Sequence, residues 1–280
     1  MLHLTYTRLI LVLLVQTVLA GCAGVSRYSQ HQDSAPTQDK DVSRIPNAIP
    51  RQEALSKYGN APAYVVMGKR YYVMQEQDRR DYVERGIASW YGSKFHGHST
   101  SSGETYDMYG MTAAHRSLPL PTFVKVTNLE NNKYVIVRVN DRGPFHPNRL
   151  IDLSYAAAKK LGITGQGTAK VEIRAIVPAD DNTRLAETET IPEPGEATPA
   201  KTSESKMYLQ VGAFSDRRNA DALRDRLIQA WQHVQIDTGY RSSQKIYRVR
   251  IGPLASVDEA DQITTRLTAR GFHDPQIVID

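Results

Sequence analysis

Alternating apolar and polar residues mark several short strands in the middle of the chain. Residues 122–127 and 133–139 alternate in this way, and residues 86–91 and 171–177 are two further apolar runs of strand length. Asn, Asp and Gly residues bound these runs, as expected for strands that end in turns. The pattern therefore predicts a sheet of short strands between residues 86 and 177.

One short helix is expected inside this β-rich region. Ser154 is a typical N-cap, residues 155–161 favour a helix, and Gly162 is a typical C-terminal stop. Short strands, frequent turns and a single short helix predict a small β-barrel rather than a layered α/β fold.

The C-terminal part of the chain repeats a pattern after about 40 residues. A strand near residues 208–212 precedes a helix carrying Leu223 and Leu227, and a strand at 247–252 precedes a helix carrying Ile263. Shorter apolar runs near Val234–Ile236 and Gln276–Ile279 complete the pattern βαββαβ. This order predicts an open antiparallel sheet with both helices on one face.

Alternation along the two long strands places five side chains on the face that the helices leave open. These residues are Tyr208, Gln210, Phe214, Arg248 and Arg250. Either the face is an ordinary solvated surface, or these aromatic, amide and guanidinium groups form a binding platform.

The first residues of the chain resemble a targeting signal. An apolar run from Leu9 to Ala20 follows Arg8 and ends just before Cys22, the single cysteine of 280 residues. The run has the length of a signal-peptide core and is too short for a membrane-spanning helix. Cys22 is either an incidental thiol or the residue that such a signal prepares for modification.

Two polar segments separate the expected domains. The predicted division is, in chain order, a signal peptide at 1–21, a disordered tether at 22–59, a β-barrel domain with an N-terminal extension at 60–177, a linker at 178–206 and the repeat domain at 207–280. The tether is rich in Ser, Gln, Asp and Pro, and the linker has four prolines and no aromatic residue.

The charge of the chain is unevenly distributed. The net charge is +5, and residues 86–177 alone carry 11 Lys or Arg against 6 Asp or Glu. This excess either maintains solubility or attracts a polyanion. The export signal disfavours nucleic acid as the partner and favours an acidic cell-wall polymer. A single cysteine also excludes an intramolecular disulfide and a zinc site built on several cysteines.

Three polar residues on the expected connecting segments are candidates for chemistry. Glu104 lies in a Gly-rich loop, His115 follows two alanines, and Asp141 ends a strand before a Gly-Pro turn. A carboxylate at a strand end is held by a rigid element and can face a groove. Each residue also has a structural reading: Asp141 as a turn former, His115 as a core histidine and Glu104 as a surface acid.

Aromatic residues and histidines near this loop allow two further interpretations. Four aromatic side chains either stack on a sugar or belong to the core: Trp90, Tyr91, Phe95 and Tyr106. His96 and His98, together with His115 and His146, offer imidazoles for zinc. No helix fixes a His pair at zinc-ligand spacing, so no metal is predicted.

The motifs of the central region together are similar to those of the rare lipoprotein A family. The segments that carry the resemblance are Ala88–Gly92, Phe95–Gly97, Ser102–Glu104, Thr112–His115, Val124–Leu129, Arg138–Phe145 and Ile151–Ser154. The resemblance implies a double-psi β-barrel and endolytic cleavage of peptidoglycan glycan strands. It assigns catalytic roles to Glu104, His115 and Asp141, and it implies no metal or organic cofactor.

The chemistry that the resemblance implies needs one proton-transferring carboxyl group, because a lytic transglycosylase uses the 6-hydroxyl of the sugar as the nucleophile. We expect Asp141 to be that group. Glu104 is expected to orient the sugar or to raise the pKa of Asp141, and His115 is expected to hydrogen-bond one of the acids. Strand alternation predicts that Asp141 shares a face with Val139 and points away from Arg138.

Two more resemblances complete the hypothesis. Residues 207–280 are similar to a SPOR domain, which implies binding to peptide-free glycan strands at division septa. Leu19–Cys22 resembles a lipobox, which implies acylation of Cys22, and Ala23 favours the outer membrane. Division proteins are then candidate partners. The rival hypothesis is an expansin-like or scaffold lipoprotein that binds septal glycan without cutting it.

Overall fold

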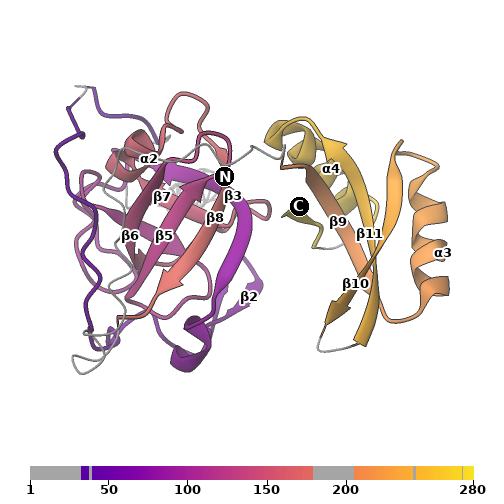
Figure 1. The fold of residues 1–280 in the computed structure, drawn as a ribbon, viewed down its shortest axis with the longest axis horizontal. Helices are drawn as coiled ribbons and strands as arrows, with labels where there is room; N and C mark the ends of the chain where they lie inside the picture. The colour runs from indigo at the N-terminus through magenta and orange to yellow at the C-terminus, as the bar shows by residue number, and fades with distance from the viewer. Residues whose placement is uncertain (1–32, 38–39, 179–204, 242–243, 273) are drawn as a thin grey trace, which may run out of the picture. The chain divides into compact units, whose positions relative to one another are not determined.

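The computed structural model describes residues 33–37, 40–178, 205–241, 244–272 and 274–280. It contains a closed barrel and a C-terminal sheet with two helices (Figure 1). Cys22 and most of the predicted linker lie outside the described residues.

Six strands close the barrel in the order β3-β7-β4-β6-β5-β8. Their bounds are β3 Val83–Tyr91, β4 Thr112–His115, β5 Thr122–Asn128, β6 Tyr134–Asp141, β7 Ile151–Ser154 and β8 Ala169–Ile176. β3 pairs with β7 and β4 with β6 in parallel, and the other neighbours are antiparallel. The predicted small barrel is confirmed.

The strands β4 and β7 are not among the predicted strands. Each has only four residues, so each offers at most two residues to either face. That is too short for alternation to be recognised, and both strands depend on the pairings that β4 makes with β6 and β7.

The helix α2 (Tyr155–Leu161) follows β7 directly and closes part of the core. The Ser154 hydroxyl accepts a hydrogen bond from the Ala157 amide at 3.3 Å, and Gly162 adopts a left-handed φ of 79°. These are the N-cap and C-terminal stop that the sequence predicts. Because Ser154 is both the last residue of β7 and the N-cap of α2, the helix fixes the end of that strand.

The described part of the predicted tether packs on the barrel, which corrects the expectation of disorder for this stretch. Val42 is only 4% exposed and joins the barrel core, and Ile45 packs against it. Asn47 and Ala48 exchange hydrogen bonds with the backbone of Ile136 on β6. Apolar contacts, this edge pairing and polar contacts such as the Lys160 Nζ bond to the Ile45 carbonyl hold the segment, although its overall composition is polar.

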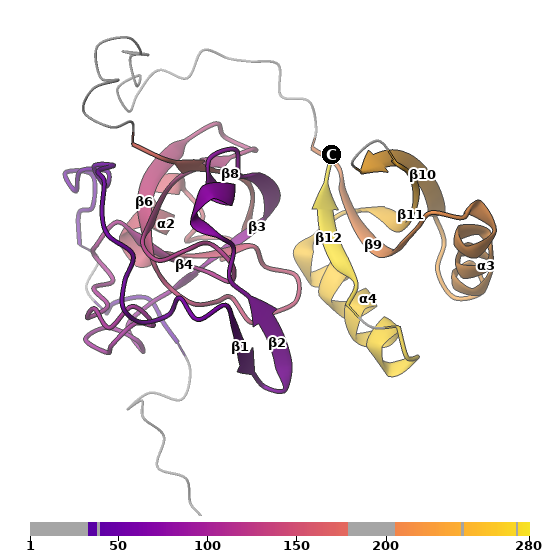
Figure 2. The same ribbon diagram turned by 90° about the horizontal axis from the view of Figure 1, so that it is seen from below.

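A hairpin and a 3-10 turn lead from this segment into β3. The hairpin consists of β1 (Ala63–Val66) and β2 (Lys69–Tyr72), and the turn is η1 (Glu76–Arg79). Figure 2 shows the hairpin projecting from the barrel.

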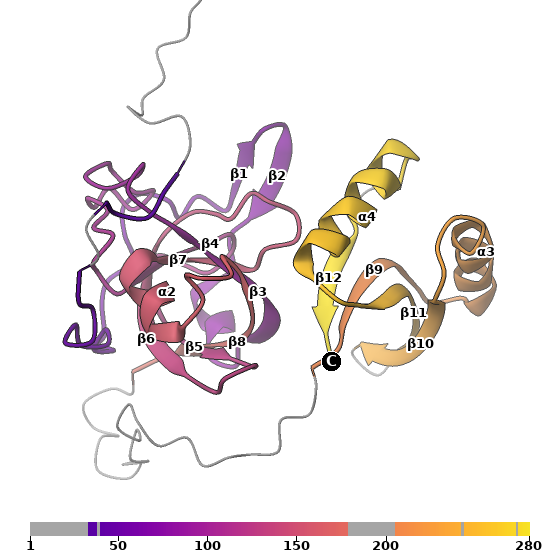
Figure 3. The same ribbon diagram turned by 90° about the horizontal axis from the view of Figure 1, so that it is seen from above.

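The C-terminal domain has the predicted order βαββαβ. Its elements are β9 Met207–Phe214, α3 Arg217–Leu227, β10 Val234–Arg241, β11 Gln244–Leu254, α4 Val257–Ala269 and β12 Gln276–Ile279. The sheet is antiparallel with strand order β10-β11-β9-β12. Leucine, isoleucine and alanine side chains of both helices belong to one core with the sheet, as predicted. Figure 3 shows α3 and α4 beside this sheet.

Candidate active site

A loop before β4 and the end of β6 hold Asp141 in place. One carboxylate oxygen of Asp141, Oδ1, accepts hydrogen bonds from the Ser101 amide at 2.8 Å, the Ser101 hydroxyl at 2.6 Å and the Arg142 amide at 2.7 Å. The other oxygen, Oδ2, makes no hydrogen bond to any residue in the described part of the chain. Asp141 is therefore fixed in orientation with one oxygen left for a ligand.

A register shift changes the face on which Asp141 lies. Ala113 pairs with Val139, but the next residue, Ala114, pairs with Asp141, so Asn140 is an extra residue in β6. Because neighbours in register share a face, Asp141 lies with Ala114 on the side opposite Val139. The expectation that Asp141 and Val139 share a face is wrong, since simple alternation cannot anticipate a bulge.

Glu104 lies beside the same loop and is bound by a guanidinium. Its carboxylate accepts hydrogen bonds from Arg138 Nη1 at 2.7 and 2.8 Å and from Asn140 Nδ2 at 2.8 Å. Burial alone raises the pKa of Glu104, but the bonds from Asn140 and Arg138 and the charge of Arg138 outweigh it, so the pKa is lowered. Glu104 is therefore ionised, and its charge is balanced by Arg138.

This pairing changes the role expected for Glu104. A carboxylate compensated by Arg138 is a weak source of the repulsion that would raise the pKa of Asp141. The Arg138 guanidinium also pairs with Glu53 at 2.7 Å. Arg138 is paired with Thr112, two residues before Ala114, so the register shift places Asp141 on the face of Arg138, and the expectation of opposite faces is wrong. The Glu104 side chain remains 42% exposed, which leaves it able to contact a ligand.

His115 ends β4 on the opposite side from Ala114 and does not hydrogen-bond either acid, contrary to expectation. Its Nδ1 accepts from the Ser117 and Leu118 amides at 3.2 and 3.1 Å, and its Nε2 lies 3.1 Å from the Tyr82 hydroxyl. Because Nδ1 accepts two hydrogen bonds, the ring proton is on Nε2, which donates a hydrogen bond to the Tyr82 hydroxyl oxygen. The Tyr82 hydroxyl in turn donates to Glu84 at 2.5 Å.

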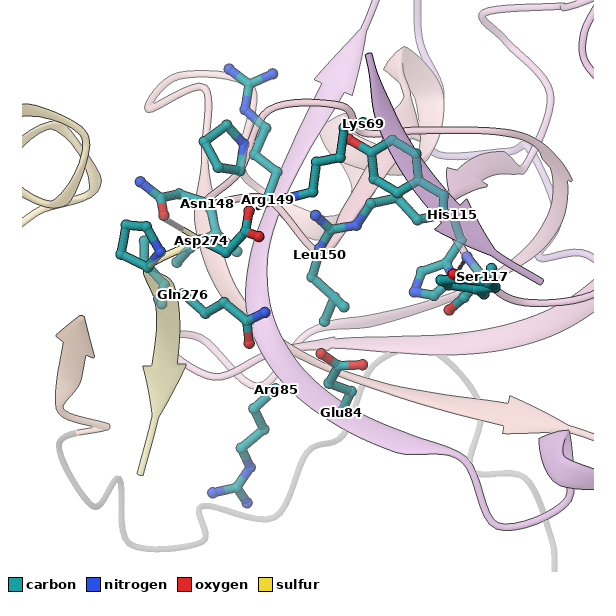
Figure 4. A pocket seen from close by; sticks show the side chains of 18 residues that line it. Lys69, Glu84, Arg85, His115, Ser117, Asn148, Arg149, Leu150, Asp274 and Gln276 are labelled. Carbon is teal, nitrogen blue, oxygen red and sulfur yellow. Dashed lines mark hydrogen bonds and ion pairs between the residues drawn. The ribbon is translucent and has the colours of Figure 1, made fainter. Parts of the chain in front are cut away.

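Burial makes His115 neutral. The residue is 2% exposed, and burial, followed by the charges of Arg116 and Arg142, lowers its pKa to about 3. Figure 4 shows His115 beside Ser117, with Glu84 on the strand below. In this arrangement His115 holds the turn after β4, and it affects the site only by fixing the backbone of that turn.

Arg142 is a structural residue of the site that the sequence analysis did not single out. Its buried guanidinium donates to the carbonyl oxygens of Gly59, His115 and Leu118 at 2.8, 3.1 and 2.6 Å. It thus ties the segment after Asp141 to the turn after β4 and to the N-terminal segment. The Asn-Asp-Arg motif contains it, so the motif itself was the available signal.

Most of the predicted aromatic candidates belong to the core. Tyr91 and Tyr106 are buried and stacked at 4.2 Å, and Trp90 packs edge-on against Tyr155. Phe95 is partly buried and packs against the cluster that contains Tyr91, Tyr106 and Tyr155. A different aromatic group forms around Phe145, which follows the Gly-Pro turn after Asp141. Its other members are Tyr64 and Tyr71 of the β1–β2 hairpin.

The four histidines considered for zinc do not form a metal centre within the described ranges. No group of three or more His, Cys, Asp or Glu side chains in those ranges is placed to hold a metal ion. His96 accepts a hydrogen bond from the Met108 amide through Nδ1, so this nitrogen already has a partner.

The open face of the C-terminal sheet differs from the predicted platform at two of its five positions. Gln210 pairs with Arg250 and Gly212 with Val249, which makes Val211 an extra residue in β9. The bulge turns Phe214 toward the helices, where it packs on the core. Phe214 is therefore not part of the open face.

Arg250 lies on the open face but is neutralised there. Its Nη1 pairs with Asp280 at 2.8 Å and with Asp237 at 3.1 Å, and its side chain is only 8% exposed. Tyr208 lies under the Arg250 guanidinium at 5.7 Å. Arg248 makes no ion pair with any described residue, so it is the guanidinium available for a ligand.

Comparisons with known proteins agree with both parts of this architecture. A family model described as lytic transglycolase matches residues 83–173, and a SPOR domain model matches residues 203–279. The endolytic peptidoglycan transglycosylase RlpA of Pseudomonas aeruginosa strain UCBPP-PA14 is 41% identical and covers 92% of this chain and 88% of its own. The chain belongs to the RlpA family of endolytic peptidoglycan transglycosylases.

Other members of the RlpA family are similar over comparable lengths. The RlpA of Vibrio cholerae is 38% identical and covers 95% of this chain and 94% of its own. A crystal structure of the Pseudomonas aeruginosa RlpA SPOR domain is 33% identical over 26% of this chain and 96% of that chain, with a TM-score of 0.25. The family models and the closed barrel confirm the predicted double-psi β-barrel and SPOR domain.

The match to the RlpA catalytic domain leaves out part of the site. The lytic transglycolase model begins at residue 83, so Glu53 and Gly59, which hold Arg138 and Arg142, precede it.

Within the described ranges no helix is long and apolar enough to span a membrane.

Proposed function

We propose that this chain cleaves the glycan strands of peptidoglycan internally, as a lytic transglycosylase that leaves 1,6-anhydro-muramyl ends. Membership of the RlpA family supports the reaction class. The observation that carries the proposal is Asp141, whose carboxylate is fixed by Ser101 and Arg142 through Oδ1 and leaves Oδ2 without a partner in the described structure.

The reaction requires proton transfer at two oxygens. The bond between the muramyl C1 and the glycosidic oxygen breaks, and that oxygen takes a proton. The muramyl 6-hydroxyl attacks C1 and gives up its proton, so neither water nor a carboxylate nucleophile is consumed. Asp141 carries proton transfer in this scheme because it is oriented at the end of β6.

Glu104 and Arg138 have a binding role in this proposal. The Glu104 carboxylate is ionised and 42% exposed, and charged acceptors form strong hydrogen bonds with sugar hydroxyls. Arg138 and Asn140 fix its position, so Glu104 orients the sugar instead of tuning Asp141. His115 and Arg142 hold the backbone around the loop.

The test is product analysis with the purified mature chain. Wild-type protein, Asp141→Asn and the exposed control Asp81→Asn are incubated with purified glycan strands, and 1,6-anhydro products are measured by mass spectrometry. We expect products from wild type and Asp81→Asn and a loss of about 100-fold or more in Asp141→Asn, with strand binding retained. Bound strands without products from the wild type would favour the rival, a glycan-binding scaffold.

We also propose a location for the chain. Acyl groups on Cys22 anchor it to the outer membrane, facing the periplasm, and the SPOR domain concentrates it at septa. The apolar run before Cys22 and Ala23 after it support the anchor. The SPOR match and the free guanidinium of Arg248 support binding to glycan strands. Division proteins remain predicted partners.

A further inference from the structure

A second aspartate lies on the same face of the barrel as Asp141. Across four neighbouring strands, Ser89 pairs with Asp152, Asp152 with Ala114, and Ala114 with Asp141. Residues paired in register point to the same side of a sheet. Asp152 and Asp141 therefore flank Ala114 on one face, and both acids are only partly buried there, whereas Ala114 is 5% exposed.

The Asp152 carboxyl makes no hydrogen bond to any residue in the described ranges. Its Oδ1 is shielded from solvent without a hydrogen bond, and the carboxyl makes no ion pair with any described residue. Buried carboxyl groups in proteins are normally paired, because an unpaired charge is costly to desolvate. Asp152 thus resembles a group kept for a ligand more than a structural acid.

The surroundings of Asp152 keep it protonated at mildly acidic pH. Burial raises its pKa to about 6, the charges of Arg149 and Arg116 oppose this rise, and Asp33 adds to it. Tyr91 on β3 and Asp141 on β6 are further titratable groups of the same site, because the charges of Asp141 and Asp152 raise the pKa of the Tyr91 hydroxyl in addition to burial. An acid of this kind can donate a proton near neutral pH, which the ionised Glu104 cannot.

Other buried polar atoms around the pair also lack partners. They are Tyr91 Oη, Thr112 Oγ1 and Asn140 Oδ1. Thr112 faces the Tyr91 hydroxyl and partly offsets the rise in its pKa, although the two atoms do not form a hydrogen bond of normal geometry. Tyr91 and Thr112 lie on the strands that flank β7. A ligand with several hydroxyl groups would satisfy this set, as a sugar does.

We infer that Asp152 is a second catalytic carboxyl group, which protonates the glycosidic oxygen while Asp141 accepts the proton of the muramyl 6-hydroxyl. This inference rests on the proposed function and assigns its two proton transfers to different residues. The electron pair of the C1–O bond leaves with the glycosidic oxygen, which takes the Asp152 proton. The 6-oxygen bonds to C1 and its proton passes to Asp141. Proton exchange with solvent then returns Asp152 to its acid form and Asp141 to its carboxylate.

The spacing of the two strands suits this division. Two strand spacings separate the Cα atoms of Asp141 and Asp152 by roughly 9–10 Å. Glycosidases whose acid and base act on opposite sides of the sugar have carboxyl groups roughly 6.5–9.5 Å apart, and this Cα separation is compatible with such a distance when both side chains project from one face. Here the 6-hydroxyl of the sugar occupies the place that water takes in those enzymes.

The experiment compares Asp152→Asn with wild type and with Asp81→Asn in the full mature chain. We expect Asp152→Asn to lower kcat on purified glycan strands by about 100-fold or more, with strand binding unchanged. Wild-type activity should fall as the pH rises through about 6, and this alkaline decline should be absent from the residual activity of Asp152→Asn. The melting temperature should not fall, because the change removes an unpaired buried acid.

Each other outcome overturns the inference. Wild-type cleavage rates in Asp152→Asn, or a slow variant that keeps the alkaline decline, exclude Asp152 as the acid. Should Asp152→Asn fail to fold, Asp152→Ser tests the same step. Absence of 1,6-anhydro products from both wild type and Asp81→Asn would instead overturn the proposed function, and the inference with it.

Discussion

Hydrogen-bond partners decide what the polar residues near the barrel loop can do. Glu104 accepts hydrogen bonds from Arg138 and Asn140 and stays ionised, whereas Asp152 has no hydrogen-bond partner among the described residues and is held toward its neutral form by burial. His115 is neutral because it is enclosed by the turn after β4. Residues of the same chemical class thus have different roles according to what surrounds them.

The first prediction concerns Glu104. Since Arg138 keeps it ionised, Glu104→Gln should not move the alkaline decline of cleavage, in contrast to a residue that tunes Asp141. We expect a loss of about 10- to 100-fold in kcat/KM from weaker sugar binding. Cleavage measured from pH 4 to 9, with Glu130→Gln as an exposed control, tests this. An alkaline decline shifted to lower pH would restore the tuning role.

The second prediction concerns His115. An unfolded histidine has a pKa of about 6.5, while the folded value is about 3, so below 6.5 the unfolded chain binds a proton that the folded chain does not. This lowers the free energy of unfolding as the pH falls, by about 2 kcal/mol between pH 7 and 5. Asn can accept the same amide hydrogen bonds without titrating.

Urea unfolding of wild type and His115→Asn at pH 7 and pH 5 measures this effect. The loss of stability on acidification should be smaller by about 2 kcal/mol in His115→Asn. An equal loss in the two proteins would show that His115 is accessible to protons in the folded state.

At the scale of elements, bulges position the functional side chains. The extra residue Asn140 in β6 moves Asp141 onto the face of Ala114, and the extra residue Val211 in β9 turns Phe214 into the helix-facing core. A bulge reverses the alternation of every residue that follows it in the strand. The C-terminal ends of both strands therefore differ from a simple alternating pattern.

The third prediction separates the two arginines of β11. Arg250→Ala removes the ion pairs with Asp237 and Asp280, whose side chains are 36% and 53% exposed, and should destabilise the SPOR domain by about 1–2 kcal/mol. Arg248→Ala should leave its melting temperature unchanged and weaken binding to glycan strands about tenfold. Calorimetry and strand pull-down with the full chain compare the two. Unchanged binding in Arg248→Ala would exclude the open face as the glycan site.

At the scale of the whole molecule, the chain contains two domains that act on the same polymer. The barrel belongs to a family that cleaves peptidoglycan glycan strands, and the SPOR domain is proposed to bind them. Residues 178–206 separate the two domains and carry four prolines. A SPOR domain of modest affinity then raises the local concentration of strands near the barrel, which increases the overall avidity.

The fourth prediction concerns Cys22, which lies outside the described residues. Cys22→Ser should abolish incorporation of a labelled fatty acid and leave an uncleaved or soluble periplasmic form, because the single thiol is the expected acylation site. Metabolic labelling and membrane fractionation measure this. Label retained in Cys22→Ser would contradict the lipid anchor.

The fifth prediction concerns targeting. A fluorescent fusion that lacks residues 207–280 should spread around the cell envelope, whereas the full chain gathers at septa. The barrel should keep its cleavage of purified strands, because its core closes within residues 42–173. Septal fluorescence in the truncated fusion would show that another segment directs the chain.

Local patterns in the sequence were sufficient for much of this protein. The longer barrel strands, the capped helix α2 and the βαββαβ repeat all depend on periodicity and caps between near neighbours, and the structure confirms them. The family motifs placed Glu104 and Asp141 beside one loop. These features are legible because the residues that cause them are close in the chain.

Only the tertiary structure decided how those residues face one another. The pairing of Asp152 with Ala114, the bulge at Asn140 and the capture of Glu104 by Arg138 each depend on strands that meet from distant parts of the chain. Val42 joins the core for the same reason. Burial and charge compensation are properties of these long-range contacts, so they set the pKa of each acid and cannot be read from its sequence neighbours.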